Sequence, residues 1–94
     1  MVQKVIWSPE SLKNLKEIQD YILKDSAFYA FHVINKIYLL AESIAAFPYS
    51  GRVVPEFENE LVRERFYRKF RIIYRIKSEF IEIAAVRHSA RLLQ

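Results

Sequence analysis

The spacing of apolar residues predicts two amphipathic helices in the first half of the chain. A short β-forming run, Val2 to Trp7, comes first, and Ser8-Pro9-Glu10 follows it. Serine can cap a helix and proline suits its first position, so a helix is expected to begin here. Ser26 is placed to cap the second helix after a break at Lys24-Asp25. The first helix carries one apolar stripe at three- and four-residue spacing, formed by Leu12, Leu15, Ile18 and Ile22.

The second helix, about 27–46, is predicted to bury a wider surface. The short connection between the helices predicts an antiparallel hairpin. Phe47-Pro48 ends the helix, because the residue before a proline resists helical geometry, and the only glycine, Gly51, follows. The width of the apolar surface indicates packing on both the sheet and the first helix. One face holds Ala30, Val33, Ile34, Ile37, Ala41 and Ile44, and Phe28, Phe31, Tyr38 and Leu39 widen it.

Three strands are predicted by alternation between residues 61 and 86. In the first strand, Leu61 to Tyr67, one face carries Leu61, Arg63, Arg65 and Tyr67, and the other carries Val62, Glu64 and Phe66. In the second, Phe70 to Lys77, the even positions are apolar and the odd face is cationic, with Arg71, Ile73, Arg75 and Lys77. The third, Phe80 to Val86, is apolar on both faces apart from Glu82, which predicts a central strand. Residues 53–60 are expected to form an ordered loop.

This order of elements predicts an α+β fold in a single domain over residues 1–94. It consists of an N-terminal strand, an antiparallel helical hairpin and a three-stranded antiparallel meander. The helices are expected on one face of a small twisted sheet, with arginines exposed on the other face.

Composition narrows the possible environments of this fold. The chain has no cysteine, which excludes disulfides and thiolate metal sites and fits a reducing compartment. No apolar run approaches the about 20 residues of a membrane span, and Met1 to Glu10 lacks the apolar core of a signal peptide. We therefore expect a cytoplasmic protein without a membrane partner.

Charge is divided between the two halves of the chain. Residues 1–47 hold five lysines and five acids, whereas residues 61–94 hold seven arginines and two lysines against three glutamates. This basic surface is either a solvated sheet face or a surface for an anion, such as nucleic acid or an acidic protein segment. Arginine favours the second because it makes planar, bidentate contacts to phosphate and carboxylate. All eight arginines follow residue 51: Arg52, Arg63, Arg65, Arg68, Arg71, Arg75, Arg87 and Arg91.

Over almost its whole length the chain resembles the RelE/ParE superfamily of toxins from type II toxin–antitoxin systems, often described as plasmid-stabilisation proteins. The ordered combination that carries the resemblance is the helical hairpin, then Ser50-Gly51-Arg52, Pro55-Glu56, Arg63-Glu64, Arg71-Ile72-Ile73-Tyr74, and His88 with Arg91. The resemblance implies a growth-inhibiting toxin neutralised by a cognate antitoxin that covers its basic face.

Two activities are implied within the superfamily. ParE-like members poison DNA gyrase, and RelE-like members cleave messenger RNA on the ribosome. The loop 50–56 followed by Arg63-Glu64 is more similar to the ParE-type subgroup, whereas the last strand ending in His88 is similar to several RNA-cleaving members. We favour the gyrase interpretation and keep a metal-independent endoribonuclease as the alternative. A second alternative is a basic binding module that is not a toxin.

RNA cleavage by internal attack needs a base, a cation on the phosphate and an acid for the leaving oxygen. Arg71 is the candidate phosphate clamp because its strand face is predicted to be open, and the resemblance places an arginine there in RNA-cleaving members. His88 is the candidate acid or base. Arg63 and Arg65 fall where relatives use lysines, and alternation points Glu64 away from both.

Each candidate also has an ordinary structural interpretation. Arg71 can pair with Glu82 across the hairpin, and His88 can be a solvated strand end. Arg63 and Arg65 can brace the acidic loop through its glutamates. The chain has no tyrosine after Tyr74, where several RNA-cleaving relatives stack one on a base, and this argues against RNA cleavage. No metal or other cofactor is expected, and the binding surface is expected to use Arg52, Arg75, Arg87 and Arg91.

Overall fold

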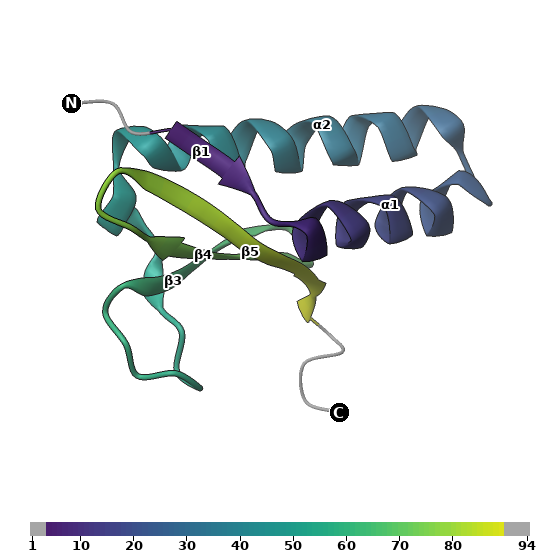
Figure 1. The fold of residues 1–94 in the computed structure, drawn as a ribbon. Helices are drawn as coiled ribbons and strands as arrows, with labels where there is room; N and C mark the ends of the chain where they lie inside the picture. The colour runs from purple at the N-terminus through teal and green to yellow at the C-terminus, as the bar shows by residue number, and fades with distance from the viewer. Residues whose placement is uncertain (1–3, 90–94) are drawn as a thin grey trace.

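The computed structural model describes residues 4–89 and confirms the α+β fold, with both helices packed on the sheet (Figure 1). Its helices are α1 (Pro9–Leu23) and α2 (Ala27–Ser43), followed by two short 3₁₀ turns, η1 (Ile44–Ala46) and η2 (Pro48–Ser50). No helix in the described part of the chain is long and apolar enough to cross a membrane. The strands are β1 (Lys4–Trp7), β2 (Arg52–Val53), β3 (Val62–Tyr67), β4 (Phe70–Ile76) and β5 (Phe80–His88).

The five strands form one mixed sheet in the order β1-β5-β4-β3-β2. The predicted antiparallel meander β3-β4-β5 is confirmed, and β1 pairs parallel to β5. This pairing places β5 between two neighbours, as its apolar character on both faces predicted. Arg52 and Val53 form a short strand, β2, against β3, although residues 53–60 were expected to be a loop.

Both helices begin at the predicted serines. The Ser8 hydroxyl accepts a hydrogen bond from the Ser11 amide, and the Ser26 hydroxyl accepts one from the Tyr29 amide. Ser8 also donates its hydroxyl proton to the carbonyl of Ala84, the extra residue of a β-bulge in β5. One side chain thus starts α1 and fixes it against the sheet.

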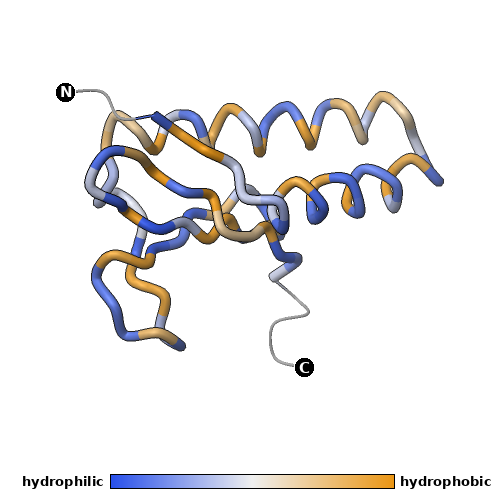
Figure 2. The backbone as a smooth tube through the Cα atoms, viewed as in Figure 1, coloured by the Kyte–Doolittle hydropathy of each residue, from blue (hydrophilic) through white to orange (hydrophobic). Residues whose placement is uncertain are grey.

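The main core lies between the helical hairpin and one face of the sheet. Figure 2 shows apolar and polar segments alternating along the helices and strands, which is the pattern that two packed layers require. The core is built from Val33, Ile37 and Ala41 of α2 together with Ile72, Tyr74, Ile81 and Ile83 of the sheet. Two predictions about the helices are wrong. Leu12, Phe28, Phe31, Tyr38 and Leu39 are all exposed, although the Tyr38 ring stacks on Trp7 of β1. The predicted packing of α2 on both α1 and the sheet is confirmed.

A second, smaller core covers part of the opposite face of the sheet. Val54 is fully buried against Val62, Ile73 and Ala85, so the segment after β2 folds back across β3 and β4. Its backbone is held by a hydrogen bond from the Val54 amide to the Val62 carbonyl. The face away from the helices is therefore only partly open, where the alternation pattern predicted an open arginine face.

Candidate functional site

The strand register separates the candidate catalytic residues onto two faces of the sheet. Phe66 lies opposite Arg71, and Arg65 lies opposite Ile72, so Arg71 shares a face with Glu64 and not with Arg63 or Arg65. His88 lies opposite Phe70 on the helix side. The prediction that Arg63, Arg65 and Arg71 are exposed on one face is therefore wrong. The prediction that Glu64 points away from Arg63 and Arg65 is confirmed.

Arg71 is buried in an ion-pair network. Its residue is only 6% exposed, and its Nε lies 2.7 Å from Oε1 of Glu64, whose side chain is fully buried. The two groups form an ion pair without the alignment of a hydrogen bond. Arg52 pairs with the other carboxylate oxygen of Glu64. The prediction of an open Arg71 is wrong because the loop after β2 covers this part of β4.

Glu82 is not the partner of Arg71. It lies directly opposite Arg75, and the two side chains pair at 3.2 Å. Arg71 instead reaches the loop acid Glu56, whose Oε2 lies 3.3 Å from its Nη2. The pKa of Glu56 is lowered by a hydrogen bond from its own backbone amide and by the positive charges of Arg71 and Arg52. No pattern in the sequence indicates this contact, since the loop has no periodicity that predicts where Glu56 points.

Arg63 and Arg65 brace the turn that precedes β2. Arg63 stacks on the Tyr49 ring, with its guanidinium carbon 4.9 Å from the ring centre, and donates to the Gly51 and Glu60 carbonyls at 2.9 and 2.8 Å. Arg65 donates to the Ser50 hydroxyl at 2.9 Å. Bracing was one of the two interpretations of these arginines, but their contacts are to carbonyls and a hydroxyl and not to the carboxylates of Glu56, Glu58 or Glu60.

Tyr74 fixes the same turn from inside the core. Its hydroxyl accepts a hydrogen bond from the Gly51 amide at 3.0 Å and donates to the Pro48 carbonyl at 2.6 Å. Burial raises the pKa of Tyr74 above its usual 10.0. A β-carbon on Gly51 would lie 2.5 Å from the Glu64 carbonyl and 2.6 Å from the Tyr74 hydroxyl, so glycine is required here by close approach.

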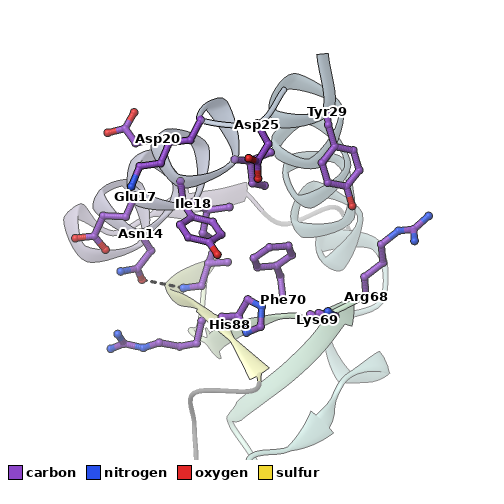
Figure 3. A pocket seen from close by; sticks show the side chains of 15 residues that line it. Asn14, Glu17, Ile18, Asp20, Asp25, Tyr29, Arg68, Lys69, Phe70 and His88 are labelled. Carbon is purple, nitrogen blue, oxygen red and sulfur yellow. Dashed lines mark hydrogen bonds between the residues drawn. The ribbon is translucent and has the colours of Figure 1, made fainter. Parts of the chain in front are cut away.

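His88 lies in a groove between the α1–α2 tip and the β3–β4 turn (Figure 3). The groove has a volume of about 1220 Å³ and opens to solvent. The His88 ring meets Phe70 edge-on with centroids 5.4 Å apart, and the two rings lie below Ile18 and Tyr29 of the helices in Figure 3. Arg68 and Lys69 approach the groove from the turn. The sheet itself lies between this histidine and Arg71.

In the strand register the expected binding arginines start from the face away from the helices, but the Arg87 side chain lies at the sheet edge, where its Nη2 is 3.9 Å from Oε2 of Glu10 in α1. Arg52 lies opposite Glu64, Arg75 opposite Glu82, and Arg87 opposite Arg71 in the strand register. The side chains of Arg52, Arg75 and Arg87 are about half exposed or more. The fourth expected residue, Arg91, lies outside the described residues. Within residues 4–89, no three His, Cys, Asp or Glu side chains are grouped closely enough to hold a metal ion.

The fold, a helical hairpin packed on a small mixed sheet, is shared with two solved structures. A structure of the chromosomal ParDE toxin–antitoxin system from P. aeruginosa superimposes with a TM-score of 0.77 at 19% identity, covering 93% of this chain and 96% of that one. The YoeB dimer from Staphylococcus aureus gives a TM-score of 0.61 at 16% identity, covering 90% and 94%. At these identities the likeness concerns the fold.

Sequence comparison identifies the family. The model of the ParE toxin of the type II toxin–antitoxin system parDE matches residues 5–93, and the chain therefore belongs to this family. It is also 30% identical to Toxin RelE2 of Caulobacter vibrioides over 89 residues, which cover 95% of this chain and 98% of that protein. The predicted membership of the RelE/ParE superfamily is confirmed, and with it a type II toxin whose family implies a cognate antitoxin.

Proposed function

We propose that this toxin acts in the cytoplasm by binding DNA gyrase through the arginine-bearing face of its sheet, in the manner of ParE-like toxins, and does not cleave RNA. The observation that carries the proposal is the separation of the candidate catalytic residues. Arg71 is closed into an ion pair on one face, whereas His88, Arg63 and Arg65 lie on the other face.

RNA cleavage requires its acid, base and phosphate clamp within hydrogen-bond reach of one substrate. In this chain a phosphate held by Arg71 has the thickness of the sheet between it and His88. Arg63 and Arg65 already donate to the turn at residues 49–51, so recruiting them to a substrate would release that turn. A binding surface has no such requirement, because charge and shape can be spread over several strands.

The face proposed to bind the target is the one that carries Arg52, Arg75 and Arg87. Their side chains are partly exposed, and each is paired with a single carboxylate that leaves further N–H donors available. We place the cognate antitoxin on the same face, where acidic or carbonyl-rich segments would meet these donors. If gyrase and the antitoxin compete for this face, the antitoxin would neutralise the toxin without blocking a catalytic group.

One observation favours RNA cleavage as a second candidate function. Glu56 is exposed and lies beside Arg71, so a carboxylate and a guanidinium meet at one point of the arginine-bearing face. Such a pair can act as a general base and a phosphate clamp. This route would use Glu56 and Arg71 without His88, and it differs from the catalytic set expected from the sequence.

Two reactions with the purified chain separate these functions. The protein is added to a translating ribosome extract and, in parallel, to a gyrase supercoiling reaction. We expect inhibited supercoiling with intact message, and the same inhibition by His88→Ala and Glu56→Gln. Message cleavage that is lost in Glu56→Gln and retained in His88→Ala would replace the proposal with the Glu56–Arg71 route.

A third test addresses toxicity itself. Inducing the gene alone should arrest growth, and coexpression of the antitoxin should restore it. Unchanged growth in cells that contain the chain as soluble protein would exclude a toxin. The remaining interpretation would then be a basic binding module.

A further inference from the structure

The groove beside His88 has an aromatic surface that neither proposed function uses. It lies between the α1–α2 tip and the β3–β4 turn, and we call it the tip groove (Figure 3). Its volume of about 1220 Å³ exceeds the about 300–1,000 Å³ of typical small-ligand sites, so it has room for an organic ligand. In Figure 3, Phe70 lies at the centre of the groove, with Tyr29 above it and His88 below it. The aromatic residues that line the groove are Tyr21, Tyr29, Phe70 and His88.

Charges of opposite sign lie on different sides of the tip groove. In Figure 3, the acids Glu17 and Asp20 lie on the left and Arg68 lies on the right. The β3–β4 turn therefore offers a cationic side opposite the acids of α1. A wholly acidic ligand is repelled by one side, and a wholly basic ligand is repelled by the other. The charged residues that line the groove are the acids Glu17, Asp20 and Asp25 and the cations Lys24, Arg68, Lys69 and Arg87.

The β3–β4 turn holds its cations in place at a cost in backbone strain. Arg68 has a φ of 52°, in the left-handed region that hairpin turns usually fill with glycine, asparagine or aspartate. Its guanidinium carbon lies 5.7 Å from the centre of the Tyr67 ring, and its Nε donates to the Tyr67 hydroxyl at 3.3 Å. The Lys69 carbonyl accepts a hydrogen bond from the Ser89 amide at 2.6 Å, which ties the turn to the end of β5. Strained residues that their surroundings hold in place are concentrated at functional sites.

We propose that the tip groove binds a free nucleoside 5′-polyphosphate. The base stacks among the aromatic side chains, because a nucleobase offers a flat face to Tyr29 and Phe70. The phosphates meet Arg68 and Lys69 of the turn. The ribose hydroxyls and the exocyclic amine of the base are neutral donors, and the carboxylates on the other side of the groove accept hydrogen bonds from them. A ligand with an anionic end and a donor-bearing aromatic end thus matches all three parts of the groove.

Calorimetric titration of the full-length chain with ATP tests the binding. We expect a Kd of about 10–100 µM. Adenosine and inorganic triphosphate should each bind at least about tenfold more weakly, because the first lacks the charged contacts and the second lacks the stacking. No binding of ATP up to about 1 mM would leave the groove to a peptide of mixed charge and would overturn the proposal. Equal binding of inorganic triphosphate would do the same, because it would show an adventitious anion only. Tighter binding of a short oligo(dA) than of ATP would replace the free nucleotide with single-stranded nucleic acid.

Two double variants with the same change in net charge locate the phosphate end. Arg68→Gln/Lys69→Gln removes both cations of the turn and should weaken ATP binding at least about tenfold. Arg75→Gln/Lys77→Gln removes an exposed arginine and an exposed lysine near the other end of β4 and should bind ATP like wild type. Equal weakening in both variants would overturn the proposal, since general charge attraction would then explain the binding.

A separate variant tests the aromatic part of the groove. Tyr29→Leu keeps an apolar side chain on α2 and should weaken ATP binding at least about tenfold while leaving the weak binding of inorganic triphosphate unchanged. Circular dichroism confirms that each variant is folded, and if the turn variant is not, the Tyr29→Leu titration decides. Unchanged ATP binding in Tyr29→Leu would overturn the proposal. The titrations contain neither gyrase nor ribosomes, so their outcome is independent of the proposed function.

Discussion

Replacing Arg71 by leucine should destabilise the fold severely, because it leaves the buried Glu64 carboxylate without its buried partner. The Glu64 side chain is fully buried and is held by Arg71 from within the sheet and by Arg52 from its edge. Leucine keeps the apolar stem of Arg71 but removes its guanidinium. Glu64 then retains only Arg52, whose side chain is 62% exposed and is screened by water.

The expected loss follows from the cost of breaking a buried ion pair. Removing one partner of such a pair typically costs about 3–5 kcal/mol, and the remaining contact with Arg52 places this case near 3 kcal/mol. A domain of this size has about 5–15 kcal/mol of stability in total. With a urea dependence of about 1–1.5 kcal/mol per molar, the unfolding midpoint should fall by about 2–3 M.

Urea unfolding followed by circular dichroism measures this loss, and the chain supplies its own control. Arg75→Leu removes an arginine from the same strand face, but its pair with Glu82 is exposed and should cost less than about 1 kcal/mol. The double variant Glu64→Gln/Arg71→Leu should be more stable than Arg71→Leu alone, because position 64 then carries no buried charge that lacks its partner. Equal losses in Arg71→Leu and Arg75→Leu would refute the reasoning. The result also bears on activity assays, since loss of function in an Arg71 variant needs a stability measurement beside it.

Three further substitutions test the contacts around this network by urea unfolding. Gly51→Ala should cost about 1–3 kcal/mol because its β-carbon would meet the Glu64 carbonyl and the Tyr74 hydroxyl, and an unchanged midpoint would contradict this. Tyr74→Phe leaves the Gly51 amide and Pro48 carbonyl without their partner, at about 1–3 kcal/mol. Because burial raises the pKa of Tyr74, its contribution is complete below pH 10.0 and is lost as pH rises through the raised pKa, so the variant should lose less stability in alkali. The pKa of Glu56 is lowered from 4.5, so its contribution is present above that pH and is lost as pH falls through the lowered value. Glu56→Gln should flatten the acid side of the stability profile, and an unaltered profile would count against the Glu56–Arg71 contact.

The fold was predictable from sequence where local signals act alone. Ser8 and Ser26 cap helices because a hydroxyl beside a helix start needs only the next turn of backbone. Alternation assigned Glu64 and Arg65 to opposite faces of β3 because strand periodicity does not depend on what covers each face.

The environment of each face was not predictable in the same way. Arg71 looked exposed because alternation identifies its face but not the loop that covers it, and Val54 in that loop follows no period. Phe28 and Phe31 looked buried because apolar spacing reports a hydrophobic surface and not the presence of a neighbour. In the candidate site, His88 and Arg71 lie on opposite faces of the sheet because of the register between β4 and β5. That register is set by tertiary packing.

The central claim is that the arginine-bearing face acts as a binding surface for gyrase, and a titration of supercoiling inhibition tests it most directly. The variant Arg75→Gln/Arg87→Gln removes two charges from that face, and Lys13→Gln/Lys36→Gln removes two from the helices. Both should remain folded. We predict that the arginine variant needs at least about tenfold more protein for half inhibition, whereas the lysine variant matches wild type. Equal inhibition by all three proteins, or no inhibition by wild type, would contradict the account.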